Sequence, residues 1–170
     1  MNIDKTRTAC FSGYRPEKFP FPINKNSEEY VQLRNDINGA VIKAVEQGYN
    51  TFLCGMAKGF DLLCAKAVIE IKKEQSDIQL ISVLPFEKHS FADIWGALHR
   101  AVRNAADGEI VVSTNYSRGC YQLRNNFMVE NSSYIICYWD GQNGGTAQTI
   151  RMAEKHGHSI HNLNSSVGVL

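Results

Sequence analysis

Short apolar runs alternate with helical segments along almost the whole chain, and this alternation constrains the fold more than any other feature. The runs typical of strands are Thr8–Ser12, Thr51–Cys54, Gln79–Leu84, Glu109–Val112, Tyr134–Tyr138 and, at an edge, Ser159–Leu163. The segments typical of helices are about Ser27–Gln47, Asp61–Glu74, Ser90–Asn104, Gly119–Glu130 and Thr146–His156. Strands that are connected by helices form parallel sheets. We therefore expect a three-layer α/β fold with a mostly parallel sheet of five or six strands flanked by helices.

A length of 170 residues predicts one domain, which we place at residues 1–163, followed by a frayed tail at 164–170. The one long linker, Gly13–Asn26, carries three prolines, which predict an ordered loop over the sheet edge. Asn26 and Glu29 have capping-box spacing before the first helix, and Gly48 and Gly157 stand where a helix C-cap prefers glycine.

The composition is that of a globular protein without a strong overall electrostatic field. Eighteen Lys and Arg against seventeen Asp and Glu leave a formal charge of +1, which argues against bulk attraction of a polyanion or an acidic membrane. Five scattered cysteines predict reduced, mostly buried thiols, and His156, His158 and His161 are predicted to be surface residues rather than metal ligands. No apolar stretch approaches the roughly 18 to 20 residues of a membrane span. We expect a cytoplasmic protein with no metal and no membrane contact.

The turn Cys54–Asp61 lies between a strand-like run and a strongly periodic helix. Gly55 and Gly59 permit positive φ and close approach of a ligand, and the first amides of the helix attract an anion. The turn therefore predicts a phosphate site, although glycines at such junctions also serve turn geometry alone. Asp61 is either a helix cap or a carboxylate that accepts a hydrogen bond from a ligand hydroxyl.

Two further turns follow predicted strands, where ligands of open parallel sheets bind. They are Ser12–Pro16 and Asp140–Thr146, and both are polar and contain glycine. Gly144–Thr146 opens a helix, so its amides and the threonine hydroxyl suit a second phosphate or a ribose edge. We expect the three turns to converge on one crevice.

The segment from Tyr116 to Val129 is the other candidate cluster. Its helix is expected to bury Leu123 and Phe127, which places Arg124 and Asn125 off the core stripe. Arg124 is then either a fork for a phosphate or a surface charge or ion-pair partner, and Arg15 has the same alternatives.

These elements together resemble the YpsA-like family of the SLOG superfamily over about Ala9–Asn162. The matching elements are Ser12–Pro16, Gly55–Asp61, Leu84–Phe86 with Trp95, Arg124–Asn125 with Met128–Val129, and Gly144–Thr146. The resemblance implies a Rossmann-like domain that binds nucleotides, nucleotide derivatives or related phosphorylated ligands, without an assured reaction. The Gly-x-x-x-Gly-x-Asp and Arg-Asn elements are also similar to those of the DNA-processing protein DprA.

The LOG-type phosphoribohydrolases of the same superfamily carry a Pro-Gly-Gly-x-Gly-Thr turn and, three residues later, a glutamate that assists departure of the base. This chain has Gly144–Thr149 instead, with Thr149 where the carboxylate is needed. Asp61, Asp140 or Glu130 could serve in principle. The departure nevertheless disfavours a hydrolase, and no catalytic residue is assigned.

We expect a protein that binds a nucleotide or phosphorylated nucleoside derivative and acts as a sensor or adaptor, with no other cofactor. The expected ligand-binding residues are Gly13, Arg15, Pro16, Gly55, Met56, Ala57, Lys58, Gly59, Asp61, Tyr116, Arg124, Asn125, Asp140, Gly144, Gly145 and Thr146. One alternative is LOG-like cleavage of a nucleotide N-glycosidic bond. The other is single-stranded nucleic-acid binding through a patch of Arg15, Arg118 and Arg124, with Tyr116 or Tyr121 for stacking. The near-neutral charge disfavours it. The sequence does not determine the oligomeric state, and a homo-oligomer is one alternative.

Overall fold

The structure, a computed structural model, describes residues 2–164, in which strands and helices alternate. The strands are β1 Thr8–Ser12, β2 Thr51–Cys54, β3 Gln79–Leu84, β4 Gly108–Val111, β5 Tyr134–Cys137 and β6 Ser159–Asn162. The helices are α1 Glu28–Glu46, α2 Phe60–Ile71, α3 Trp95–Ala105, α4 Cys120–Glu130 and α5 Gly145–Lys155, with short 3-10 helices η1 Lys5–Arg7 and η2 Pro16–Lys18. Of the predicted tail, Asn164 is buried and residues 165–170 lie outside the described residues.

One six-stranded sheet runs through the protein in the order β4-β3-β2-β1-β5-β6, and every pairing is parallel. The chain adds β2, β3 and β4 on one side of β1 and then returns to place β5 and β6 on the other side. This reversal makes a topological switch between β1 and β5, where ligands of open α/β sheets bind. The predicted parallel α/β sheet is confirmed.

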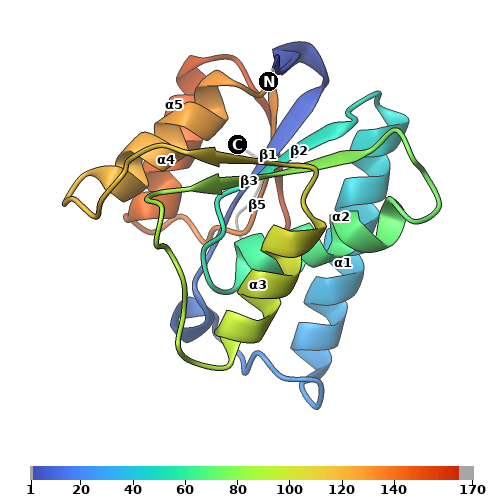
Figure 1. Ribbon diagram of the computed structural model, residues 1–170. Coiled ribbons are helices and arrows are strands. Elements are labelled where there is room, and N and C mark those ends of the chain that lie inside the picture. Colours follow the sequence, from blue (N-terminus) through green and yellow to red (C-terminus); the bar gives the residue numbers. More distant parts are fainter. Residues whose placement is uncertain (1, 165–170) are drawn as a thin grey trace.

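Helices cover both faces of the sheet and complete the three predicted layers. α1, α2 and α3 pack on one face, and α4 and α5 pack on the other (Figure 1). Strand side chains alternate between two cores: Phe11 and Phe52 belong to one, and Cys10 and Leu53 to the other. Because both faces are covered, β1 and β5 are buried along their whole length. The arrangement is Rossmann-like.

The five cysteines are all buried and free, as predicted. Burial raises the pKa of the Cys10 thiol to about 12, against a smaller lowering by a hydrogen bond from Ser132. A thiol with such a pKa stays protonated and unreactive near neutral pH. Cys10 therefore acts as a small apolar core residue.

Two helix starts differ from the prediction. Ser27, rather than Asn26, caps α1, because its Oγ accepts a hydrogen bond from the Tyr30 N–H at 3.2 Å. α3 begins at Trp95, whose N–H donates to Asp93 at 3.1 Å. Adjacent residues of similar capping strength make such boundaries hard to place from a sequence.

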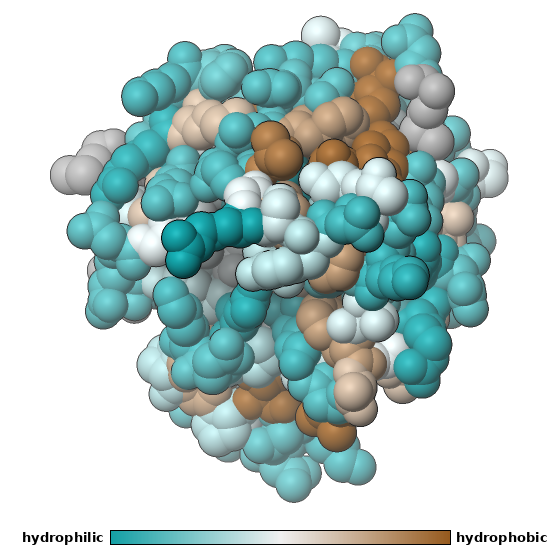
Figure 2. Space-filling view, turned by 60° about the vertical axis from the view of Figure 1, so that its left-hand side comes forward, coloured by the Kyte–Doolittle hydropathy of each residue, from teal (hydrophilic) through white to brown (hydrophobic). Residues whose placement is uncertain are grey.

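Exposed apolar side chains are dispersed over the surface. In the view that brings the α4 and α5 side forward, hydrophilic residues cover most of the face and apolar residues form separate groups (Figure 2). The large apolar residues with substantial exposure are Val31, Ile42, Ile94, Val111, Tyr116, Leu123 and Ile160. Within residues 2–164, no helix combines the length and the hydropathy that a membrane crossing requires.

Replacing Gly39 by alanine is expected to raise the free energy of unfolding by up to about 1 kcal/mol, or about 2–4 °C in Tm. Gly39 lies inside α1, and a Cβ built there meets nothing within 4 Å. The alanine lowers the entropy of the unfolded chain without a clash. Thermal unfolding of both proteins checks this, and a lower Tm of the variant would contradict the open surface at Gly39.

Candidate functional site

A cavity of about 180 Å³ lies at the carboxyl ends of the central strands, at the topological switch. Its lining consists of Phe11, Ser12, Gly13, Tyr14, Arg15, Lys18, Ala57, Asp61, Tyr121, Arg124, Asn125, Gly145 and Thr146. The expected residues that lie outside this lining are Pro16, Gly55, Met56, Lys58, Gly59, Tyr116, Asp140 and Gly144. The three predicted turns therefore converge, but each contributes only part of its length.

The turn after β2 uses much of its hydrogen-bonding capacity within the protein. The Met56 N–H donates to the Cys54 Sγ at 3.3 Å, and the Ala57 N–H donates to an Asp61 carboxylate oxygen at 3.4 Å. The Phe60 N–H donates to the carbonyl of Tyr14 at 3.1 Å. These amides are engaged before any ligand arrives, two of them within the turn and the start of α2 and one with the loop after β1.

Lys58 in the same turn points away from the cavity. Its ammonium group forms an ion pair with Asp93 and lies 4.7 Å from the centroid of the Phe91 ring. Lys58 is therefore occupied on the α3 side of the protein.

Arg124 is the main correction to the sequence interpretation of α4. Its side chain is buried, with 5% of the residue exposed, whereas Leu123 is 50% exposed. The core stripe of α4 contains Cys120, Arg124 and Met128, at a spacing of one helical turn. The hydrophobic pattern was misleading because this stripe crosses a polar cavity as well as the apolar core.

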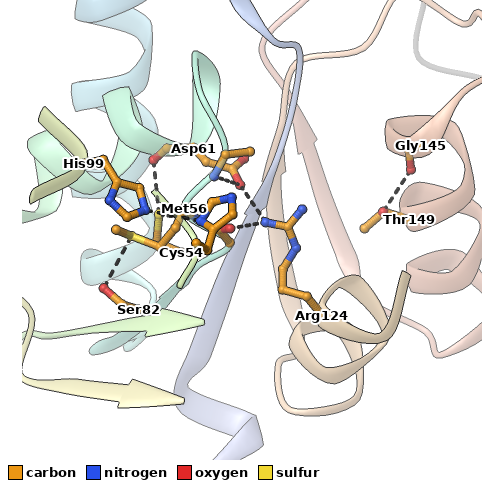
Figure 3. A network of polar contacts seen from close by, with 11 residues as sticks. Cys54, Met56, Asp61, Ser82, His99, Arg124, Gly145 and Thr149 are labelled. Carbon is orange, nitrogen blue, oxygen red and sulfur yellow. Dashed lines mark hydrogen bonds and ion pairs between the residues drawn. The ribbon is translucent and has the colours of Figure 1, made fainter. Parts of the chain in front are cut away.

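The Arg124 guanidinium reaches across the sheet edge to the turn after β2 (Figure 3). One Nη donates to the Gly55 carbonyl and lies 3.8 Å from a carboxylate oxygen of Asp61. The buried Nε has no hydrogen-bond partner among residues 2–164. Because Arg124 lines the cavity, the guanidinium keeps donor capacity there for an anionic ligand.

This contact requires glycine at position 55. A Cβ at Gly55 would lie 2.4 Å from the Arg124 Nη1 and 2.8 Å from the Asp61 Oδ2. Any side chain would therefore displace the ion pair. The close approach that the sequence predicted at Gly55 is made by side chains of the protein itself.

Burial dominates the electrostatics of the pair. It raises the pKa of Asp61 to about 6, against the opposing effects of the Arg124 charge and the Ala57 N–H. Burial also lowers the pKa of Arg124, and Asp61 opposes that change. The pKa of Asp61 is therefore raised toward neutral pH, while an arginine stays protonated.

The N-terminus of α5 forms the opposite wall of the cavity, through Gly145 and Thr146. No side chain caps this helix within the described part of the chain. A Cβ at Gly145 would meet nothing within 4 Å, and a Cβ at Gly144 would lie 3.4 Å from the Lys18 ammonium. The first turn of α5 thus lies at the cavity next to a cation, and a helix N-terminus attracts anions.

Thr149, at the position of the LOG-type glutamate, is buried. Its hydroxyl donates to the Gly145 carbonyl at 3.0 Å, within α5 (Figure 3). Thr149 therefore supports the helix and does not line the cavity.

Lys18 lines the cavity but was absent from the expected set, and Tyr121, which was expected only as a stacking residue for single-stranded nucleic acid, lines it as well. The Tyr121 ring is close to two cations, with its centroid 5.7 Å from the Arg15 Cζ and 5.9 Å from the Arg124 Cζ. Tyr116 is 66% exposed, and its ring centroid is 6.4 Å from that of Tyr121. The one feature of the sequence that could have identified Lys18 as a site residue is its position in the proline-rich loop that follows β1.

Asp140 is held at the rim by the Tyr14 hydroxyl, which donates to it. This hydrogen bond, together with one from the Gln142 N–H, lowers the pKa of Asp140 against a small effect of burial. Asp140 therefore remains ionised near neutral pH and fixes the Tyr14 ring next to the cavity.

The histidines near the C-terminus differ partly from their prediction as surface residues. His158 is 9% exposed, and its Nε2 lies 3.2 Å from the Ser132 Oγ and 3.0 Å from the Val129 carbonyl. His158 directly precedes β6, and its side chain points inward and packs against the C-terminal end of α4. Among the described residues, no group of three or more His, Cys, Asp or Glu side chains has the arrangement of a metal site.

Comparison with known proteins agrees with this architecture. A family model named YpsA, described as the YspA SLOG family, matches residues 9–167. A UPF0398 protein of Bacillus cereus is 24% identical over 164 residues, which cover 94% of this chain and 88% of that protein. A UPF0398 protein of Bacillus thuringiensis has the same identity and coverage.

Two solved structures share the fold. DNA processing protein A of Streptococcus pneumoniae has a TM-score of 0.61 and 16% identity over 95% of this chain, which spans 53% of that protein. DNA processing protein A of Helicobacter pylori, which binds single-stranded DNA, has a TM-score of 0.62 and 16% identity. The match covers 94% of this chain and 68% of the chain of that protein. At this identity the likeness concerns the fold.

Proposed function

Because this chain belongs to the YpsA family of SLOG proteins, we propose that its cavity binds a nucleotide or a phosphorylated nucleoside derivative. The protein would act as a cytoplasmic sensor or adaptor. Its five buried free thiols suit a reducing compartment. The observation that carries the proposal is the meeting of the uncapped α5 N-terminus with a buried arginine at the topological switch.

The charges at the cavity favour an anion. Arg15, Lys18 and Arg124 line it together with one carboxylate, that of Asp61. The phosphate would lie on the first amides of α5, within reach of the Lys18 ammonium and the Arg124 guanidinium. This placement differs from the sequence expectation, because the turn after β2 already uses several of its amides internally.

The size of the cavity indicates which part of the ligand is enclosed. Its volume of about 180 Å³ is smaller than the roughly 300–1,000 Å³ of pockets that enclose drug-sized molecules. A phosphate and its sugar would occupy it, with Asn125 and Ser12 available to the sugar hydroxyls. The base would then lie outside, near Tyr121 and the exposed Tyr116.

Replacing Gly145 by aspartate is expected to weaken nucleotide binding at least about tenfold, or 1.4 kcal/mol, without loss of stability. A carboxylate in the first turn of α5 repels a phosphate but favours the helix dipole. The open space at Gly145 accepts the new side chain. Thermal shift and calorimetry with AMP, GMP, CMP and UMP measure the binding, with adenosine as a phosphate-free comparison.

Gly119→Asp is the matched control, because Gly119 is the N-cap of another helix, α4, has open space around it and lies outside the cavity lining. It should leave binding unchanged. Equal affinity of the Gly145→Asp variant and the unchanged protein would reject the phosphate position on α5. No shift with any phosphorylated compound would reject the proposed function.

Single-stranded nucleic acid is the second candidate, favoured by the exposure of Tyr116 close to Tyr121 and Arg15. Binding of an oligonucleotide that weakens steeply with salt, and that exceeds the binding of mononucleotides, would favour this candidate. Hydrolysis is not part of the proposal, because Thr149 offers no carboxylate and its hydroxyl is engaged within α5.

A further inference from the structure

We propose that Asp61 takes up a proton when an anion enters the cavity, so that affinity for a phosphorylated ligand increases as the pH falls. The inference rests on the proposed function and concerns the regulation of the same site. Asp61 is a buried carboxyl group among the cations that a ligand would use.

Asp61 belongs to the first turn of α2, and its side chain turns back to accept the Ala57 N–H. It is 4% exposed and, among the described residues, supplies the one carboxylate of the cavity lining. The nearest cation is Arg124, 3.8 Å away, which also offers the unpartnered Nε (Figure 3). An anion that binds Arg124 therefore arrives next to Asp61.

The other groups that face Asp61 do not change their charge state near neutral pH. Arg15 and Arg124 are cations throughout. The thiols that interact with Asp61 come from three elements, Cys10 on β1, Cys54 on β2 and Cys64 on α2, and burial raises the pKa of each. They stay uncharged, which leaves Asp61 as the group able to change charge.

Two further groups near the cavity also stay neutral. Burial raises the pKa of Tyr14 to about 12, with the hydrogen bond to Asp140 adding to the rise. Burial lowers the pKa of His89 to about 3, and the nearby His99 and Arg124 add to that lowering. Neither group gains or loses a proton between weakly acidic and weakly basic pH.

The direction of the coupling follows from the charges. A bound phosphate brings negative charge next to Asp61 and competes for Arg124, and both effects raise the pKa of Asp61 above its value of about 6 in the empty site. Between these two pKa values, binding takes up a proton and affinity falls as pH rises, by at most about tenfold per pH unit. Below the lower pKa, Asp61 is already protonated and the dependence ends.

Calorimetry of AMP binding in two buffers of different ionisation enthalpy counts the protons directly. At about pH 7.5 the AMP phosphate is already a dianion, since a phosphomonoester has a second pKa of about 6. We expect an uptake of about one proton per AMP bound to the unchanged protein. The measurement needs no variant, so it does not depend on the folding of one.

Asp61→Asn supplies the second measurement. The amide oxygen can still accept the Ala57 N–H, and the neutral side chain imitates protonated Asp61. The variant should take up no proton and should bind AMP at least about fivefold more tightly than the unchanged protein at about pH 8. Asp4→Asn is the matched control, because Asp4 is an exposed carboxylate outside the cavity lining whose pKa is lowered by hydrogen bonds from Thr6, and it should leave the proton count unchanged.

Binding of AMP without proton uptake, or equal uptake by the Asp61→Asn variant, would overturn the inference and leave the proposed function intact. Absence of binding by AMP and by ribose 5-phosphate at every pH would instead overturn both. The two failures are therefore distinguishable.

Discussion

Replacing Arg124 by methionine is expected to lower the free energy of unfolding by about 3 kcal/mol at about pH 8 and to abolish nucleotide binding. The variant leaves the Asp61 carboxylate buried without its nearest opposite charge and removes the donor to the Gly55 carbonyl. Methionine retains much of the length of the arginine stem, so the effect reports charge and hydrogen bonding more than lost packing.

The loss of stability should increase with pH. Consider a carboxyl group whose pKa in the native state exceeds its pKa of about 3.9 in the unfolded state. Its contribution to the free energy of unfolding is fully present below the unfolded-state pKa and is lost as pH rises through the native-state pKa. Burial already raises the pKa of Asp61 to about 6, and removal of the opposing Arg124 charge raises it further. The variant therefore loses this contribution over a wider pH interval than the unchanged protein.

Urea unfolding at about pH 5 and about pH 8 measures the loss of stability and its dependence on pH. The control is Arg118→Met, which replaces an exposed arginine just before α4 and should change the free energy of unfolding by no more than about 0.5 kcal/mol. The same loss at the two pH values would contradict the coupling between Arg124 and Asp61. An unchanged affinity for AMP would remove Arg124 from the binding site.

Gly59→Ala is expected to lower the free energy of unfolding by at least about 3 kcal/mol, or about 6–12 °C in Tm. Gly59 has φ 84° and ψ −123°, a conformation that is strained for any residue with a Cβ. The added Cβ would also lie 2.5 Å from the Tyr14 carbonyl oxygen. This backbone atom belongs to the loop after β1 and accepts the Phe60 N–H, so it cannot move without breaking that bond.

Gly119→Ala provides the comparison for Gly59→Ala. Gly119 has φ −100°, and a Cβ there meets nothing within 4 Å. Its replacement should change stability by about 0.5 kcal/mol or less. A Tm of the Gly59→Ala variant within a degree or so of the unchanged protein would contradict the close contact between the two loops.

The fold was predictable because its signals are local and repeated. β1, β2 and β3 have the predicted bounds, and alternation of strands with helices leaves few topologies other than a parallel sheet covered on both faces. The positions of the turns follow from the same alternation. Residues after β1, β2 and β5 were therefore correctly expected to meet.

The details of the site were less predictable because they depend on contacts between distant segments. Whether the amides after β2 are available depends on Asp61 and on the Tyr14 carbonyl, and the latter belongs to another loop. The burial of Arg124 depends on the space left by Gly55. Periodicity treats a buried helix face as apolar, so it selected Leu123 instead of Arg124.

The return of the chain from β4 to β5 also has a kinetic consequence. The β2–β4 half and the β5–β6 half of the sheet meet along β1, and the cavity spans them, with Ala57 and Asp61 on one side and Gly145 and Thr146 on the other. A ligand held across this seam opposes separation of the halves. If the seam opens in the rate-limiting step of unfolding, the ligand slows unfolding more than it accelerates folding. Occupancy would then lengthen the lifetime of the native protein under proteolysis that requires full unfolding.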